Sequence, residues 1–202
     1  MRSLIFGCCM ATLLLGYNPA HMKKLLDEEA CIACDLSGAD LSKRDFTGYE
    51  LQGSDLRGAD LSGSNFFMAD LHGADFSRAK LDNAVFWKAD LSFGEFVGTK
   101  APGANFKGAD LQNATFKNCD MSRTVAWKAD FSGASIERTD FSSSELGAAR
   151  FFDTDLSDSE LYDAILWQTE FKNTVLTSEQ RAYAEKEEAI FLDSVKGEAY
   201  EK

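Results

Sequence analysis

A pair of cysteines two residues apart is the sequence feature with the clearest chemical potential. The pair stands in the segment Cys31-Ile32-Ala33-Cys34. Such a CxxC pair can be redox-active, supply half of a zinc site or close a small disulfide. The chain has no second CxxC motif and no histidine pair to complete a tetrahedral zinc site. It also lacks a βαβ pattern that would indicate a thioredoxin-like protein.

Carboxylates are the most numerous reactive groups, but they follow a structural rhythm rather than an active-site arrangement. Asp40, Asp60 and Asp110 each stand just before a bulky apolar residue. Asn65 and Asn105 take the same place, which indicates that side-chain hydrogen bonding matters there as well as charge. Because the chain has only 2 histidines and no Ser/His/Asp or Cys/His set, we expect no enzyme activity, no metal site and no cofactor.

The charge balance restricts the classes of partner. The chain of 202 residues has 21 basic and 33 acidic side chains, a formal net charge of -12. Direct binding to nucleic acid needs clustered Lys and Arg to neutralise phosphates, so this composition argues against it. The length is that of a single domain.

The first 20 residues follow the plan of a secretory signal peptide. Arg2 precedes an apolar run over residues 4–15, which is too short to span a bilayer, and small residues follow. Cleavage after Gly16 or after Ala20 would release the mature chain. We therefore predict export to a periplasm, a thylakoid lumen or the outside of the cell, without a stable membrane span. The alternative is an apolar helix that caps the core of a cytoplasmic protein.

The rest of the chain is organised by a period of five residues. From Leu36 to Leu176, every fifth position gives 29 residues, of which 14 are Leu and 11 are Phe. A small residue, most often Ala, usually stands two places earlier, and Gly often stands two places later. The period fits neither a helix nor a strand, and Gly at that position is typical of a turn. The pattern predicts a coil with short sides and regular corners.

This pattern, clear in Leu36-Ser37-Gly38-Ala39-Asp40-Leu41, resembles the pentapeptide repeat family over residues 34–176. The resemblance implies an all-β solenoid, a right-handed quadrilateral β-helix with four pentapeptides, or 20 residues, per coil. About seven coils would give a rod ~34 Å long, with the large apolar residues and the small residues pointing inward. Exported, cyanobacterial-type relatives have a similar cysteine pair just before the first repeat.

Both flanks are expected to close the solenoid with helices. Residues 21–33 form the predicted N-terminal cap, preceded by the helix start Asn18-Pro19. Residues 177–202 form the C-terminal cap, in which Ser178 caps a helix that continues to about Val195. In some relatives such a helix also joins two protomers. In an exported chain, a disulfide between Cys31 and Cys34 would pin the first cap to the first coil.

Sorting the repeats by coils of 20 residues separates two sides of the rod. One carries a column of acidic residues, interrupted by Arg150: Glu50, Asp70, Asp90, Asp110, Asp130 and Glu170. This column is either a docking stripe for a basic partner or a solvated ladder inherent in the repeat. The adjacent side carries outward apolar residues, including every tryptophan of the chain: Phe67, Val85, Trp87, Val125, Trp127, Ile165 and Trp167.

The apolar column predicts an interface, unless a terminal helix covers it. We therefore expect an exported, non-enzymatic scaffold or protein-interaction module, whose partner is another protein or a second copy in a homodimer. The alternative is suggested by acidic pentapeptide repeat proteins that imitate DNA and bind DNA gyrase. The net charge of -12 fits that alternative, whereas a signal peptide speaks against it, because gyrase is cytoplasmic.

Overall fold

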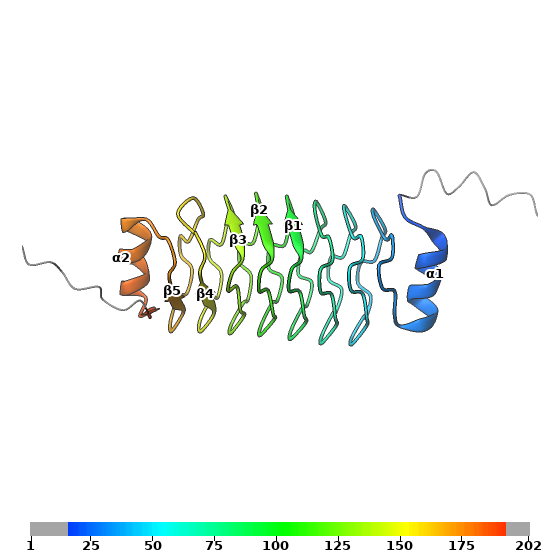
Figure 1. Cartoon of the computed structure of the whole chain (residues 1–202), viewed down its shortest axis with the longest axis horizontal. Helices are drawn as coiled ribbons and strands as arrows, with labels where there is room; N and C mark the ends of the chain where they lie inside the picture. Colours follow the sequence, from blue (N-terminus) through cyan, green and yellow to red (C-terminus); the bar gives the residue numbers. More distant parts are fainter. Residues whose placement is uncertain (1–15, 193–202) are drawn as a thin grey trace, which may run out of the picture.

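The chain winds into a straight rod with a helix at each end (Figure 1). A computed structural model describes residues 16–192, so most of the predicted signal peptide lies outside the described residues. Helix α1 (Pro19–Glu28) lies at one end and α2 (Ser178–Lys186) at the other. The strands are short and pair in parallel: β1 (Glu95–Val97), β2 (Thr115–Lys117), β3 (Ser135–Glu137), β4 (Arg150–Phe152), β5 (Glu170–Lys172) and β6 (Ile190–Phe191).

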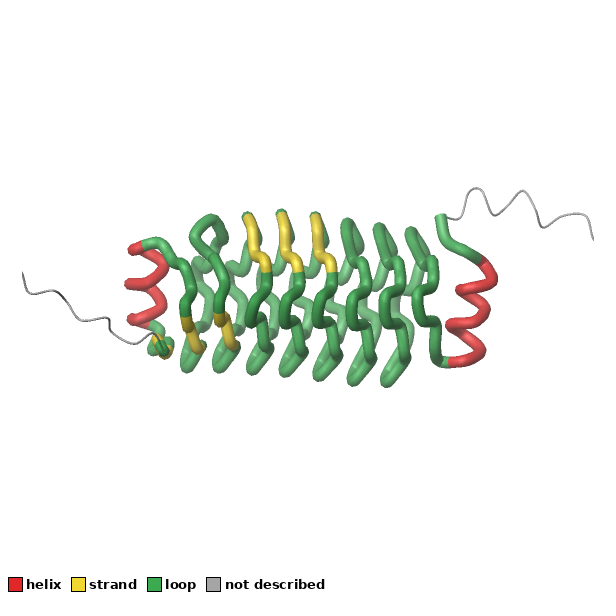
Figure 2. The backbone as a smooth tube through the Cα atoms, viewed as in Figure 1, coloured by secondary structure: helices red, strands yellow, loops and turns green. Residues whose placement is uncertain are grey.

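Neighbouring coils are held in register by backbone pairing between residues 20 apart. Glu50 pairs with Asp70 and Asp70 with Asp90, and the same spacing joins β1 to β2 and β4 to β5. Most of each coil is drawn as loop, because each side contributes only a few paired residues between two turns (Figure 2). The 20-residue coil is the length that the five-residue pattern predicts for a four-sided repeat.

Phenylalanine rings stack along the interior of the rod. Phe76, Phe96 and Phe116 are fully buried, and their ring centroids are 4.9 and 4.7 Å apart. The small residues two places earlier are buried as well, as Ala39 and Ala59 show. Large rings one coil apart are at stacking distance, and the small side chains leave room for them at the adjacent corner. The inward direction predicted for both positions is confirmed.

Aspartates before the apolar residues stabilise the turns. Oδ1 of Asp40 accepts hydrogen bonds from the backbone N–H of Ser42 at 3.0 Å and from its hydroxyl at 2.7 Å. These bonds lower the pKa of the Asp40 carboxyl. Asn105 accepts the N–H of Lys107 at 3.0 Å in the same way. Asp and Asn are interchangeable here because the turn needs an acceptor, as the sequence indicates.

Helix α1 begins at the predicted position. Asn18 is the N-cap, and its side chain accepts the N–H of Ala20 at 2.9 Å, while its own N–H bonds the Asp35 carbonyl at 3.1 Å. Leu25 is fully buried against the core, whereas the next residue, Leu26, is 47% exposed. Bonds to the first coil therefore fix the start of this helix in place.

The C-terminal helix differs from the prediction at both ends. Its N-cap is Thr177 rather than Ser178, because Thr177 and Gln180 exchange hydrogen bonds in a capping box. It ends at Lys186 instead of continuing to about Val195. The chain then turns back, and β6 pairs with β5, which stacks Phe191 on Phe171 at 5.4 Å.

Side chains of α2 donate hydrogen bonds to backbone carbonyls at the end of the solenoid. Gln180 donates to the carbonyls of Leu156 and Ser159 at 2.7 and 2.8 Å, and the Tyr183 hydroxyl donates to the Ala164 carbonyl at 2.9 Å. An exposed coil edge would leave such carbonyls free to pair with another chain. The helix thus closes part of this edge with hydrogen bonds as well as apolar contact.

The stacked core gives a matched pair of substitutions. We predict that Phe96→Ala lowers the free energy of unfolding by about 3–5 kcal/mol, because it leaves a cavity between two stacked rings. Phe93→Ala is the control, since Phe93 is 55% exposed and should cost less than about 1 kcal/mol. Chemical denaturation followed by circular dichroism measures both. Equal losses of free energy in the two variants would contradict a stabilising role of the ring stack.

Candidate protein-interaction surface

Each side of the rod presents two outward positions per coil, one before and one after the buried apolar residue. The four sides carry different numbers of carboxylates at these positions. Between residues 35 and 172, the sides that begin at Asp35, Asp40 and Glu50 carry six carboxylates each. The side that begins at Asp45 carries two, Asp45 and Glu145. We call this fourth side the Trp face.

The predicted acidic column is in register along the side that begins at Glu50. Its members pair from coil to coil: Glu50, Asp70, Asp90, Asp110, Asp130, Arg150 and Glu170. Arg150 does more than interrupt the column, since its guanidinium lies 3.2 Å from Glu170 and 3.8 Å from Asp130. Several carboxylates also accept the N–H two residues later, as Asp130 does from Ser132 at 3.0 Å. The column therefore has a structural role in the turns.

The first aromatic pair of the Trp face consists of Phe67 and Trp87. Their ring centroids are 4.8 Å apart, and the Lys88 ammonium lies 5.4 Å from the centroid of Trp87. Trp87 is 39% exposed although it contacts both Phe67 and Lys88. Val85, half-buried, stands before it on the same coil, and Met68 at the adjacent corner is 59% exposed.

The second pair joins Trp127 to Trp167 across two coils. Their ring centroids are 5.8 Å apart. This distance is shorter than the separation of their backbones, which is two coil spacings of ~4.8 Å each. The contact is possible because Gly147 lies between them. A Cβ atom on Gly147 would be 2.7 Å from the Trp127 ring, so only glycine leaves room for the indole. Val125 is half-buried and Ile165 is 47% exposed beside this pair.

The aromatic residues thus form two pairs rather than one unbroken column. Lys107 occupies the column on the coil between Trp87 and Trp127, and no ring contact joins these two tryptophans within residues 16–192. Lys88 and Met68 are not among the residues predicted for this face, because they occupy the turn position where Gly is common. The missing side chain of Gly147 permits the second pair, a role that the sequence pattern does not indicate.

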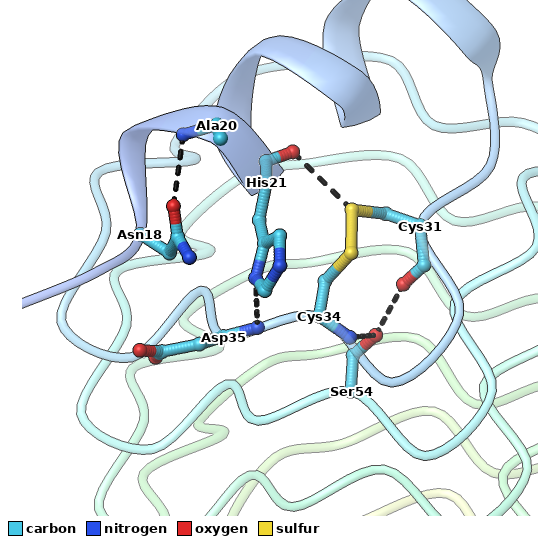
Figure 3. Close-up of a disulfide and its surroundings, with 7 residues drawn as sticks. All are labelled: Asn18, Ala20, His21, Cys31, Cys34, Asp35 and Ser54. Atoms are coloured by element: carbon cyan, nitrogen blue, oxygen red, sulfur yellow. Dashed lines mark hydrogen bonds between the residues drawn. A yellow bond between two sulfur atoms is a disulfide. The ribbon is translucent and has the colours of Figure 1, made fainter.

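The cysteine pair lies where α1 meets the first coil (Figure 3). The sulfur atoms of Cys31 and Cys34 lie 2.04 Å apart. Ser54 of the next coil links both, since it accepts the Cys34 N–H at 3.2 Å and donates to the Cys31 carbonyl at 2.6 Å. Nδ1 of His21 accepts the N–H of Asp35 at 2.8 Å and ties α1 to the same segment.

Other candidate chemistry is sparse in the part of the chain that the structure describes. Cys119 is a buried free cysteine, and burial raises the pKa of its thiol. No group of three or more His, Cys, Asp or Glu among residues 16–192 could hold a metal ion. Over the same residues, no helix is long and apolar enough to cross a membrane.

Comparison with known families identifies the fold. The profile of pentapeptide repeats matches residues 31–67, 69–108, 95–125 and 104–142, in eight copies. These segments cover more than half of the chain. The chain belongs to the pentapeptide repeat family. Its members form right-handed quadrilateral β-helices, in agreement with the four-sided coil described above.

Solved pentapeptide repeat proteins resemble the chain at low identity. HetL, involved in heterocyst differentiation regulation in Nostoc sp. strain PCC 7120, is 21% identical, covers 87% of this chain and 93% of its own, and has a TM-score of 0.38. QnrB1, a plasmid-mediated fluoroquinolone resistance protein, is 23% identical over 78% of this chain and 95% of its own, with a TM-score of 0.40. A protein of the Arabidopsis thaliana thylakoid lumen is 28% identical over 58% and 74%, with a TM-score of 0.23. No curated protein sequence gives a significant match.

The contact across Gly147 is open to a direct test. We predict that Gly147→Ala leaves the pentapeptide repeat fold intact but displaces the Trp127 ring toward solvent, since the new Cβ occupies its place. The tryptophan emission should shift to longer wavelength. In a Trp127→Leu background, where Trp87 and Trp167 still report, the same substitution should shift the emission little. An unchanged spectrum in the chain that keeps Trp127 would contradict the described packing.

Proposed function

We propose that this pentapeptide repeat protein is a non-enzymatic interaction module and that its Trp face binds another protein or a second copy. The observation that carries the proposal is the difference between its four sides. Three sides carry six carboxylates each and would repel an acidic partner. The Trp face has few carboxylates and presents exposed Trp87, Ile165 and Trp167. Exposed aromatic residues gathered on one surface are typical of interfaces. Neither α1 nor α2 supplies a described contact to these side chains.

The Trp face can be removed without disturbing the core. We predict that Trp87→Ala combined with Trp127→Ala abolishes self-association or capture of a protein partner, because it removes one ring from each aromatic pair. Sedimentation and pull-down of the purified chain measure this, and Tyr162→Ala, at a side chain 72% exposed on another side, is the control. If association and capture are unchanged in the double variant, the Trp face is not the interface.

We further propose that the chain is exported and that the Cys31–Cys34 disulfide forms in the oxidising compartment that it reaches. The contacts of α1 favour cleavage after Gly16 over cleavage after Ala20. Cleavage after Ala20 would remove Asn18, which caps the helix and bonds Asp35 of the first coil. Cleavage after Gly16 would retain both interactions.

Export makes a simple prediction. The mature protein, isolated from fractionated cells, should begin at Tyr17, and treatment with a reductant should lower its melting temperature because the cap is no longer pinned. Cys119→Ser serves as control, since it removes the buried thiol and leaves the pair intact. Recovery of the uncleaved chain in the cytosol would overturn this proposal.

A second candidate function rests on the three acidic sides. They carry eighteen carboxylates over about seven coils, or roughly one per 1.9 Å of rod, close to the one charge per ~1.7 Å of duplex DNA. With this density of negative charge, the rod would imitate DNA and bind a gyrase or topoisomerase in its place. A supercoiling assay with the mature chain separates the two functions, since inhibition or protection of gyrase is expected only from the second.

A further inference from the structure

We infer that the Trp face receives an amphipathic α-helix of a partner protein, with carboxylates placed between apolar anchors. The inference rests on the proposed function and adds the conformation and charge of the occupant. It follows from the backbone, the cations and the spacing of the aromatic pairs on this face.

The backbone N–H and C=O groups of the Trp face already form hydrogen bonds with neighbouring coils. Phe66 donates to Val85, Phe86 to Asn105 and Phe106 to Val125, each at 2.6–2.7 Å, and the same pattern continues along the rod. An extended peptide laid on this face would find no backbone partners and would leave its own N–H and C=O groups unpaired against apolar rings. A helix satisfies its backbone internally and presents only side chains. The occupant is therefore helical.

The cations on and beside the Trp face lack ionic partners. Lys107 lies in the column itself, Lys88 and Lys128 at one corner, and Arg123 at the other. None of these four forms an ion pair with another residue of the described range 16–192. On the acidic sides, four cations form ion pairs, Arg57, Lys80, Lys117 and Arg150, whereas Lys100 and Lys172 form none within the same range. In a chain of net charge -12, these groups make this face the one that complements carboxylates.

The spacing of the aromatic pairs fits a helix that lies along the rod. The centres of the Phe67–Trp87 and Trp127–Trp167 pairs are about three and a half coils apart, or ~17 Å. On a helix, residues i and i+11 are ~16.5 Å apart and lie on the same face. Positions i+4 and i+7 then lie opposite the Lys107 coil, where a Glu or Asp would meet the ammonium group.

A second copy of the rod fits this face less well. The sides that flank the Trp face carry six carboxylates each, so two rods packed face to face would bring acidic sides together. The face from Phe67 to Trp167 extends over five coil steps, about 24 Å, which with a helix width of about 10 Å gives about 240 Å². Stable interfaces bury about 800 Å² on each partner. A single helix, held by two anchors, suits the available area.

A displayed library of 18-residue helical peptides, selected on the mature chain, tests the inference. Because every tryptophan lies on this face, intrinsic fluorescence reports binding there directly. We expect selected peptides to carry apolar residues at i and i+11 with Glu or Asp between them, and to be helical when bound. Lys107→Glu should weaken their binding about tenfold. Lys100→Glu, the same charge reversal at an exposed position of an acidic side, should change it less than twofold.

The outcomes separate this inference from the proposed function. Selected peptides that are lysine-rich, or extended, or that bind the Lys107→Glu chain equally well would overturn the acidic helix while the Trp face remains an interface. The same holds if no peptide is enriched although Trp87→Ala with Trp127→Ala abolishes association. Peptides that bind the double tryptophan variant as tightly as the native chain would contradict both the helical occupant and the Trp face as an interface.

Discussion

Parallel backbone pairing between residues 20 apart is the interaction on which the rest of this structure depends. It places every fifth residue of one coil above the equivalent residue of the previous coil. Phenylalanine then stacks on phenylalanine, and each turn aspartate meets the turn of the next coil. A shift of one residue would move the buried apolar residues of a coil to outward positions. The core and the surface columns are consequences of this single register.

The same register creates open ends that other elements must cover. At the first coil, α1 is tied down by Asn18, by His21 and by the segment that contains the cysteine pair. At the last coil, α2 supplies Gln180 and Tyr183 as donors to backbone carbonyls, and β6 adds one more ring to a phenylalanine stack. Both ends thus use polar contacts where the solenoid has unpaired backbone groups, because apolar cover alone would leave those groups unsatisfied.

Function in such a rod resides in departures from the repeat. Aspartate before the apolar residue serves the turn, so a run of aspartates by itself indicates structure rather than a site. The Trp face replaces three of these acceptors with Val85, Val125 and Ile165, and it carries aromatic residues at the position after the apolar residue. The cations Lys88, Lys107, Arg123 and Lys128 on and beside it have no ionic partner among residues 16–192. A negatively charged partner therefore meets less electrostatic repulsion on the Trp face than on the other three sides. The interaction surface is therefore defined as much by missing carboxylates as by the tryptophans.

The sequence by itself determined the coil length, the inward positions, the start of α1 at Asn18 and the columns that each side carries. The inward positions follow from the strict five-residue period, whereas the length of the coil follows from the resemblance to the pentapeptide repeat family. Tertiary structure decided how neighbouring columns interact. It ended α2 at Lys186, where the chain turns back and places Phe191 on Phe171. It also divided the tryptophan column into two pairs, because the space above Gly147 lets Trp127 cross a coil to reach Trp167, a contact between residues that no local pattern links.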